Sequence, residues 1–452
     1  ADGNVEILGD DWESRALLLY DGLATAVTPS GIEDGVPRIM RGNTRTFSRA
    51  GVAYVPDPES GVVYEVSAGM PKLTRDDAGE PWLLIESARE QRAQYSAFQL
   101  GLTDFTVTGE GVNGATMEAL TAAPSGVPWP WAPGVSSYLI RCTTGSPHSN
   151  LYARYSVDSN TYAPNTRISV GASHYDEDGV AVAGLGVQRS TDGYWWNVAG
   201  GAWQASAILN PLPLSAGGFR MDSLSFNIDT GPGAESIRVY VGCPAGVTAS
   251  KKTWFGGTQL EAGAYPTSRI VARTTHLTRP AARLLYAWTT GTRLLWAAQG
   301  GLSIECFSLG DAADVSGWRT LVWQQHDSNN SFRFGYHSSY GLTLEVKVSG
   351  TTYRATRAWS PVSGTIYRLG ARWASSRGER GLAAYGLQVA LDGVLGAEVA
   401  ASGAMTEATS GDLEVGSAGA EDHWDGGLRE LRIVQGVPTE AALAKGLRRG
   451  WR

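Results

Sequence analysis

Apolar and polar residues alternate along several short stretches of the chain. Residues 342–348 (LTLEVKV) alternate without interruption, and Ile237, Val239 and Val241 alternate with more polar neighbours. Successive side chains of a strand point to opposite faces, so this pattern predicts half-buried β-strands. Asp-Gly dipeptides at 178–179, 192–193 and 392–393 favour two-residue hairpin turns between such strands.

Helical signals are few. The clearest comes at the C-terminus, where Thr439 can cap a short helix that carries Arg448 and Arg449 near its end and stops at Gly450. The chain is therefore expected to be all-β. We predict tandem antiparallel β-sandwiches (jelly rolls), with a short irregular N-terminal region and one short C-terminal helix.

The chain has 452 residues, which is too long for a single hydrophobic core. Residues 1–95 are irregular and rich in turn signals, and we predict that they form an N-terminal assembly or attachment region. Residues 96–275 and 285–452 each repeat the strand-and-turn pattern, and each is predicted to be a β domain. The polar stretch 274–280, which ends in proline, marks the join between them.

Composition narrows the classes of function. The net charge is −7 and no dense block of Lys and Arg is present, so a nucleic-acid partner is not expected. No apolar run approaches the roughly 20 residues that span a bilayer, so no membrane insertion is expected. Cys142, Cys243 and Cys306 are too few and too scattered for a disulfide framework, which suits folding in a reducing cytoplasm.

Three stretches carry resemblances to known families. Residues 47–55 (FSRAGVAYV) with 83–89 (LLIESAR) resemble a pattern of tailed-bacteriophage tail, fibre and other virion proteins, although residues 91–94 depart from it. Residues 255–268 (FGGTQLEAGAYPTS) resemble the closing strand and turn of a carbohydrate-binding-module-like jelly roll. Residues 424–433 (WDGGLRELRI) with 438–441 resemble the last strand and helix of concanavalin-A-like lectin domains of the laminin-G or pentraxin type.

These resemblances imply a function in adhesion. They imply that residues 96–275 form the carbohydrate-binding-module-like jelly roll and that residues 285–452 form the lectin-like β-sandwich. The protein would be a structural component of a phage virion: a fibre, tail appendage or capsid projection, made in the host cytoplasm. Its expected partners are further copies of itself as a homotrimer, other virion proteins and a host-surface glycan.

The expected carbohydrate-binding residues are aromatic. Tyr194, Trp195 and Trp196, with Trp203 nearby, could stack on the apolar faces of sugar rings. Alternation sends Trp195 and Trp196 to opposite faces of a strand, so at least one of them belongs to the core. Paired large aromatic residues also commonly serve packing or subunit interfaces. The same two roles, surface display or subunit packing, are open for the tryptophans of residues 129–131.

Trp424 and Asp425 complete the expected binding residues, because they lie where lectin-like folds place ligand loops. The acidic residues around them, 421–425, could hold calcium or form a solvated loop. Calcium needs about six oxygen ligands and only a few are available locally, so no metal site is expected. The acidic stretches 176–179 and 327–330 lack the ligand spacing of a calcium loop and are explained by turns.

Catalytic signals are lacking. The sequence contains no nucleophile elbow, zinc-protease, P-loop or dinucleotide-binding motif, so no catalytic residues and no cofactor are expected. We therefore expect a binding protein and not an enzyme. Two alternatives remain open: a lectin-fold enzyme that cleaves glycans with two carboxylates, and a purely structural decoration protein.

Overall fold

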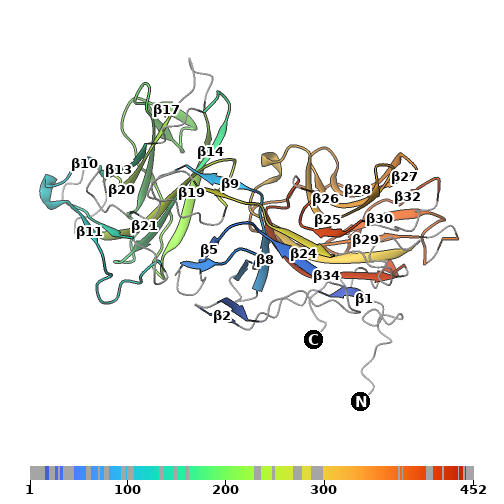
Figure 1. The fold of residues 1–452 in the computed structure, drawn as a ribbon. Coiled ribbons are helices and arrows are strands. Elements are labelled where there is room, and N and C mark those ends of the chain that lie inside the picture. The colour runs from blue at the N-terminus through green and yellow to red at the C-terminus, as the bar shows by residue number, and fades with distance from the viewer. Residues whose placement is uncertain are drawn as a thin grey trace. The chain divides into compact units, whose positions relative to one another are not determined.

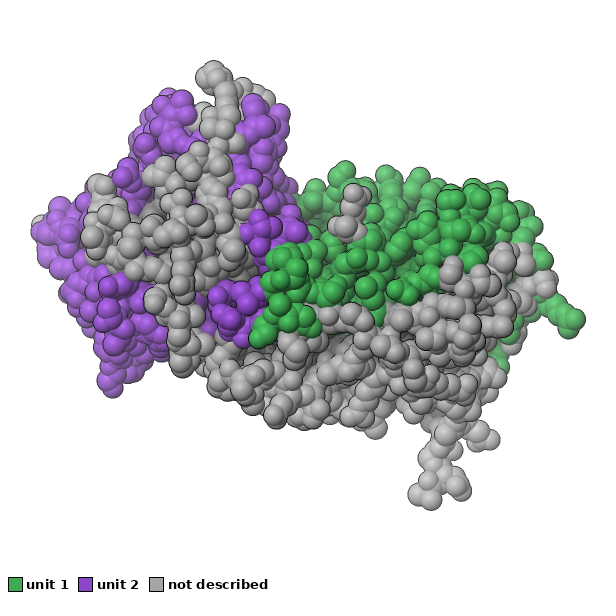
Figure 2. All heavy atoms as spheres, in the orientation of Figure 1, with its two compact units in different colours: residues 1–51, 67–87, 280–452 green, residues 52–66, 88–279 purple. Residues whose placement is uncertain are grey.

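The protein is described from a computed structural model. The structure describes residues 16–19, 26–28, 31–33, 45–56, 63–69, 72–75, 81–92, 98, 106–131, 137–145, 150–157, 162–228, 236–246, 250–267, 277–286, 299–374, 377–378, 380–403, 411–419, 422–435, 437–440 and 443. Its chain is divided between two compact units (Figure 2). Unit 1 contains residues 1–51, 67–87 and 280–452, and unit 2 contains residues 52–66 and 88–279.

Unit 1 is built from two large antiparallel sheets. The first has nine strands, in the order β31-β30-β29-β24-β34-β8-β7, with β1 added to β34 and β32 added to β30. Their bounds are β1 Ala16–Leu19, β7 Leu73–Arg75, β8 Pro81–Ile85, β24 Gly300–Ser308, β29 Ile366–Trp373, β30 Gly386–Leu391, β31 Val394–Leu395, β32 Val399–Ala400 and β34 Gly426–Gln435.

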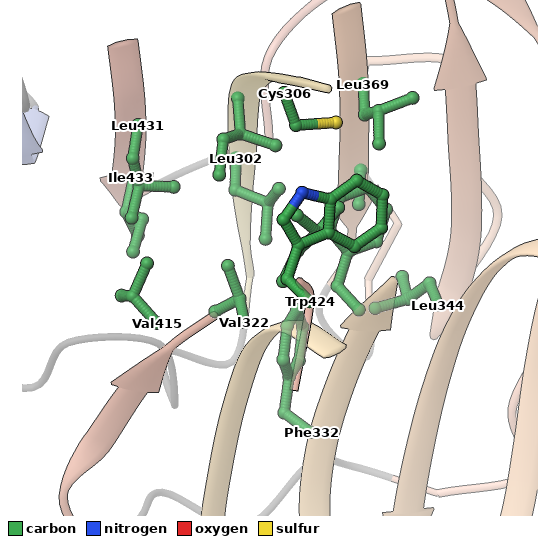
Figure 3. Close-up of a cluster of buried hydrophobic side chains, with 14 of the residues drawn as sticks. Leu302, Cys306, Val322, Phe332, Leu344, Leu369, Val415, Trp424, Leu431 and Ile433 are labelled. Carbon is green, nitrogen blue, oxygen red and sulfur yellow. The ribbon is translucent and has the colours of Figure 1, made fainter. Parts of the chain in front are cut away.

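The second sheet of unit 1 has seven strands in the order β28-β27-β26-β25-β33-β23-β4. Their bounds are β4 Arg45–Ser48, β23 Arg283–Tyr286, β25 Trp318–Asp327, β26 Asn330–His337, β27 Gly341–Val348, β28 Thr351–Arg357 and β33 Leu413–Val415. Leu344 and Phe332 from this sheet meet Leu302 and Ile433 from the first in one core, with Trp424 among them (Figure 3). Unit 1 is therefore a β-sandwich.

Unit 2 repeats the plan with different strands (Figure 1). One sheet has seven strands, in the order β10-β13-β20-β15-β16-β17 with β18 added to β15, and the other has the order β11-β12-β21-β14-β19. Their bounds are β10 Thr106–Thr108, β11 Thr116–Leu120, β12 Leu139–Thr143, β13 Leu151–Val157, β14 Arg167–Asp176, β15 Gly184–Arg189, β16 Trp195–Asn197, β17 Ala202–Gln204, β18 Asn210–Pro211, β19 Arg220–Asn227, β20 Ile237–Cys243 and β21 Lys252–Ala262.

The core of unit 2 lies between these two sheets. Val170 and Leu260 from the five-stranded sheet join Leu185, Val239 and Val241 from the seven-stranded sheet in one buried cluster. Three short strand pairs complete the described elements. These are β2–β3, β5–β6 and β9–β22, with bounds Ala26–Thr28, Gly31–Glu33, Ala53–Pro56, Val63–Val66, Arg89–Gln91 and Leu277–Arg279.

The predicted fold class is confirmed. The paired strands are antiparallel, and the named elements other than strands in the described part of the chain are two short 3₁₀ helices, η2 (Val112–Gly114) and η3 (Ala312–Asp314). The turn at Asp392 and Gly393 joins β30 to β31, and both residues have positive φ, 49° and 78°, as a type I′ hairpin requires. No helix in the described part of the chain is long and apolar enough to cross a membrane.

The predicted C-terminal helix is not supported. The one turn described there is closed by a hydrogen bond from the Leu443 N–H to the Thr439 carbonyl oxygen, and residues 444–452 lie outside the described residues. One hydrogen bond fixes a single turn, and a short helix needs further packing to persist.

Residues 1–95 contribute strands to both units. Strands β4, β7 and β8 belong to unit 1, where β4 pairs with β23 and β8 pairs with β34. Strands β5, β6 and β9 lie in unit 2. These pairings satisfy backbone groups that would otherwise be left at open sheet edges. The expected role of this region in assembly stays a prediction.

Candidate carbohydrate-binding site

The β16–β17 hairpin presents most of the expected aromatic residues. Trp196 lies directly opposite Trp203, and Asn197 lies opposite Ala202. The connecting turn is held by Asn197, whose side-chain oxygen accepts a hydrogen bond from the Gly200 N–H at 3.1 Å. Asn210 ties the hairpin to the sheet by accepting from the Val198 N–H at 2.9 Å and donating to the Trp196 carbonyl at 3.0 Å. The hairpin that carries the two tryptophans is therefore held to the sheet by hydrogen bonds.

Trp195 and Trp196 point to opposite faces, as alternation predicts. Trp195 is only 4% exposed and packs against Tyr240, with ring centroids 4.5 Å apart. Trp196 is half-buried and packs against Phe226 at 5.7 Å and against Trp203 at 5.4 Å. Trp195 thus fills a packed layer, whereas Trp196 and Trp203 line a hollow on the other face.

We call this hollow the aromatic cleft. Its volume is about 700 Å³, within the range of about 300–1,000 Å³ typical of small-molecule pockets. It is lined by Arg167, Arg189, Tyr194, Trp196, Gly201, Ala202, Trp203, Ser225, Phe226 and Asn227. Trp196 and Trp203 come from the hairpin, and Phe226 comes from β19 of the other sheet. The cleft therefore exists only where the two sheets of unit 2 are brought together.

Arg189 supplies a fixed positive charge beside the aromatic rings. Its guanidinium carbon lies 4.9 Å from the centre of the Trp203 ring and 5.4 Å from that of Tyr194. Asp192 holds it in place by accepting from Nε at 3.2 Å and from Nη2, and the same carboxylate accepts from the Tyr194 N–H at 2.9 Å. The turn at Asp192-Gly193 thus orients both a cation and an aromatic residue.

The indole N–H groups of the cleft lack acceptors. Within the described part of the chain, Nε1 of Trp196 and Nε1 of Trp203 are both buried and neither donates a hydrogen bond. A buried donor without an acceptor costs about 1–3 kcal/mol. Both nitrogens are enclosed by protein atoms, so a bound molecule would contact the ring surfaces that line the cleft. The cleft thus combines the groups that a polar, ring-shaped ligand needs.

Trp424 and Asp425 do not belong to this site, which corrects the expectation from sequence. Trp424 is fully buried in the core of unit 1, where its Nε1 donates to the Phe307 carbonyl at 2.9 Å (Figure 3). Asp425 accepts hydrogen bonds from the backbone N–H and, at 3.0 Å, the hydroxyl of Ser87. Asp425 has a φ of 50° and directly precedes β34, which begins at Gly426. Both residues therefore hold the sandwich together.

The tryptophans of residues 129–131 serve packing within unit 2. Trp131 is 2% exposed and its Nε1 donates to the Gly256 carbonyl at 2.8 Å. Trp129 is half-buried against the cluster that contains Trp254 and Phe219. Neither is displayed on a turn, so surface display, one of the two roles considered for them, is not observed.

The two acidic stretches behave as turns. The Gly179 N–H donates to the Asp176 carbonyl oxygen at 3.3 Å, which closes a turn, and the buried Asp176 side chain accepts from the Ser215 N–H at 3.1 Å. Asp327 accepts from the Asn329 N–H at 2.7 Å and from the Asn330 side chain at 3.0 Å. Among the described residues no cluster of His, Cys, Asp and Glu is arranged to hold a metal ion. The three cysteines are buried and are not joined by disulfide bonds.

Sequence reasoning missed part of the cleft. Two of the missed residues, Arg167 on β14 and Phe226 on β19, lie far from the tryptophans in sequence. Arg189 lies closer, but its strand, β15, has an ordinary composition. One feature of the sequence pointed to Arg189: Asp192 follows it by three residues, a spacing at which the two side chains can form an ion pair. Sheet pairing, and not sequence spacing, brings these side chains together.

Comparison with known proteins identifies no family. No family model and no curated protein matches the chain. Among solved structures, domain 4 of AbnA, an extracellular arabinanase from Geobacillus stearothermophilus, is 14% identical with a TM-score of 0.31, over 37% of this chain and 73% of that one. The carbohydrate-binding module of the Ruminococcus gnavus IT-sialidase is 11% identical with a TM-score of 0.27, over 36% and 92%.

A third structure is the enzymatically active domain of tailspike protein 4 of bacteriophage CBA120. It is 11% identical with a TM-score of 0.26, over 38% of this chain and 21% of that one. TM-scores at this level carry no argument about fold or function, so the aromatic cleft has to be interpreted from its own chemistry.

Proposed function

We propose that this protein is a structural component of a tailed-bacteriophage particle that binds a host-surface glycan in the aromatic cleft. The observation that carries the proposal is the pair of half-buried indoles, Trp196 and Trp203, whose rings line the cleft beside the guanidinium of Arg189. Sugar rings have apolar faces that pack on such aromatic rings and hydroxyl groups that suit a polar or charged neighbour. The virion role rests on the resemblance at residues 47–55 and 83–89.

The cleft favours holding a glycan over cleaving it. Glycoside hydrolysis commonly uses two opposed carboxylates. None of the described residues that line the cleft is Asp or Glu, and the nearby Asp192 is engaged by Arg189. The protein is therefore proposed to be a binding protein without catalytic activity. Incubation with host envelope polysaccharide should release no reducing ends, and their release would favour the alternative of a glycan-cleaving enzyme.

The proposed assembly is a homotrimer that also contacts other virion proteins. Several copies of one weak site raise avidity greatly when they bind the same surface, so a single cleft need not bind tightly. Sedimentation of the purified chain should give a trimer, and mass spectrometry of intact particles should detect the protein. A chain that stays monomeric at high concentration and is absent from particles would contradict the virion role.

The binding proposal is tested with the full chain on a glycan array, followed by titration of the best ligand. Trp196→Ala and Trp203→Ala should each weaken binding by about tenfold or more, which corresponds to about 1.4 kcal/mol. Trp318→Ala is the matched control, because Trp318 is a half-buried tryptophan of unit 1 outside the cleft. Equal affinity in all three variants would remove the cleft from the binding site, and absence of any glycan ligand would leave the decoration role.

A further inference from the structure

A second hollow lies on the outer face of the seven-stranded sheet of unit 2. On β20, Val239 and Val241 point into the core, so Arg238 and Tyr240 point to the other face. Tyr152 and Arg154 on β13 and Gln188 on β15 share that face for the same reason. These side chains, together with Trp195, enclose a hollow of about 390 Å³, which we call the basic recess.

Packed aromatic rings form the floor of the basic recess. Trp195 lies over Gly186, where an added Cβ would come within 2.9 Å of the indole ring. The Trp195 ring packs on Tyr240 at 4.5 Å, and the Tyr152 ring stands edge-on to both at 5.4 Å. Tyr152 is half-buried, so part of it remains accessible in the recess. Trp195 and Tyr240 therefore form a packed layer, and the accessible part of Tyr152 is available to contact a ligand.

The recess carries two positive charges and no described negative charge. Arg154 lies opposite Tyr240 on the neighbouring strand, and Arg238 lies two residues before Tyr240 on the same face. Arg238 donates to the Gln188 side-chain oxygen at 3.2 Å, and the Tyr240 hydroxyl donates to the same oxygen at 2.6 Å. Among the described residues that line the recess none is Asp or Glu.

Neither guanidinium is neutralised within the described part of the chain. Among the described residues no carboxylate forms an ion pair with Arg154 or Arg238, and the buried Nε of Arg238 has no hydrogen-bond acceptor there. Burial raises the pKa of Tyr240, and the nearby charges of Arg238 and Arg154 oppose that rise, which places both cations close to one phenol. Like charges on adjacent strands destabilise a sheet, and an anion between them would relieve the repulsion.

We propose that the basic recess binds an acidic saccharide, with Arg154 and Arg238 holding its carboxylate and Tyr152 contacting its ring. A guanidinium matches a carboxylate through paired N–H donors, and an aromatic surface matches a sugar ring. The chain as a whole has a net charge of −7, so the two arginines form a local feature and not part of a broadly basic surface. The site is separate from the aromatic cleft and does not depend on it.

The test measures binding of the full chain to pairs of acidic oligosaccharides and their methyl esters by calorimetry. The pairs contain galacturonate, glucuronate or N-acetylneuraminate, and each ester differs from its acid mainly by the lost charge. At least one acid should bind, its ester should bind about tenfold more weakly or worse, and added salt should weaken binding of the acid. Acetate is the control for a simple anion site.

Variants locate the site. Arg154→Gln and Arg238→Gln should each weaken binding of the acid by about tenfold or more, and Arg154→Lys should restore part of it because the charge returns without the paired donors. Lys251→Gln removes the same charge away from the recess and should leave binding unchanged. Trp203→Ala should also leave it unchanged, because Trp203 lines the aromatic cleft and not the recess. Circular dichroism checks that each variant is folded.

Four outcomes would overturn the proposal. They are no binding of any acid, equal binding of acid and ester, equal binding of acetate, and binding that survives both arginine substitutions. Loss of acid binding in Trp203→Ala alone would assign the ligand to the aromatic cleft and would also overturn it. Failure here leaves the proposal for the aromatic cleft intact, because that proposal is tested by Trp196 and Trp203.

Discussion

Adjacent tryptophans of β16 have different surroundings because a strand directs successive side chains to opposite faces. Trp195 is enclosed by Tyr240, Tyr152 and Leu209. Trp196 keeps one side towards the aromatic cleft and has an unused N–H. The first residue therefore stabilises the fold, and the second is available to bind.

This difference predicts opposite phenotypes. Trp195→Ala should lower the free energy of unfolding by about 3 kcal/mol or more, because it empties a packed aromatic layer. Trp196→Ala should cost less stability but should weaken glycan binding. Urea denaturation followed by ligand titration measures both quantities. Equal stability losses in the two variants would contradict the assignment of Trp195 to the packed layer.

His174 in unit 2 lies between two carboxylates. It is fully buried, with Nε2 2.9 Å from Asp222 and Nδ1 3.6 Å from Asp176. Burial alone would lower the pKa of His174, but the two carboxylates outweigh burial and raise it above its ordinary value of 6.5. Burial likewise opposes ionisation of Asp176, but the nearby His174 and the hydrogen bond from the Ser215 N–H lower the pKa of that carboxyl below 3.8. Arg220 adds a second positive charge, 2.9 Å from Asp222.

These shifts predict a pH dependence of stability. The His174 contribution is complete below pH 6.5, the unfolded-state pKa, and is lost as the pH rises through the higher folded-state pKa. The Asp176 contribution is complete above 3.8 and is lost as the pH falls through the lower folded-state pKa. The free energy of unfolding should therefore decline from about pH 6.5 upward. His174→Gln should abolish that part of the decline, and an unchanged pH profile in the variant would contradict it.

At the scale of elements, close strand packing depends on a few glycines. On β20, Gly242 faces the neighbouring strand β13, and a Cβ at this position would lie 2.0 Å from the Leu151 carbonyl oxygen. Backbone atoms cannot rotate away as a side chain can. The pairing of β13 with β20 therefore requires glycine here.

Gly242→Ala is expected to destabilise the protein by about 2 kcal/mol or more, because the added methyl group forces the two strands apart. Gly217→Ala is the matched control. Gly217 has no atom within 4 Å of an added Cβ and does not have the positive φ that favours glycine. Thermal unfolding of the two variants provides the comparison, and similar melting temperatures would show that the sheet absorbs the extra methyl group.

At the scale of the whole molecule, the two units are interleaved along the chain. Residues 67–87 belong to unit 1, although the next 192 residues, 88–279, belong to unit 2. Leu83 and Ile85 of β8 are part of the unit 1 core, and Gly416 lies against Ile85 so closely that a Cβ would come within 2.7 Å. Unit 1 therefore cannot be completed by the C-terminal segment alone.

This organisation predicts unequal fragments. Residues 88–279 contain every strand of both unit 2 sheets and should fold with cooperative unfolding. Residues 280–452 lack β4, β7 and β8, so they should aggregate or unfold at lower urea concentration. Co-expression with residues 67–87 should increase the soluble yield. Equal stability of fragment 280–452 and the full chain would contradict the proposed contribution of β8.

Local pattern was sufficient to predict much of the fold. The alternation at 342–348 and at Ile237, Val239 and Val241 lies in β27 and β20 as expected, and Asp392-Gly393 forms its hairpin turn. These features depend on neighbours in the chain, so they can be inferred without tertiary contacts. The burial of Trp424 could not be inferred in this way, because it is enclosed by β24 and the neighbouring sheet, which are distant in sequence.

The sequence by itself determined the all-β class, the strand segments, the turns and the opposite facing of Trp195 and Trp196, because backbone geometry depends on nearest neighbours. Only the tertiary structure decided which tryptophans remain accessible and which arginines join them. Arg189, Phe226 and Trp203 meet through the pairing and stacking of sheets, and that arrangement depends on burying apolar side chains drawn from the whole of unit 2.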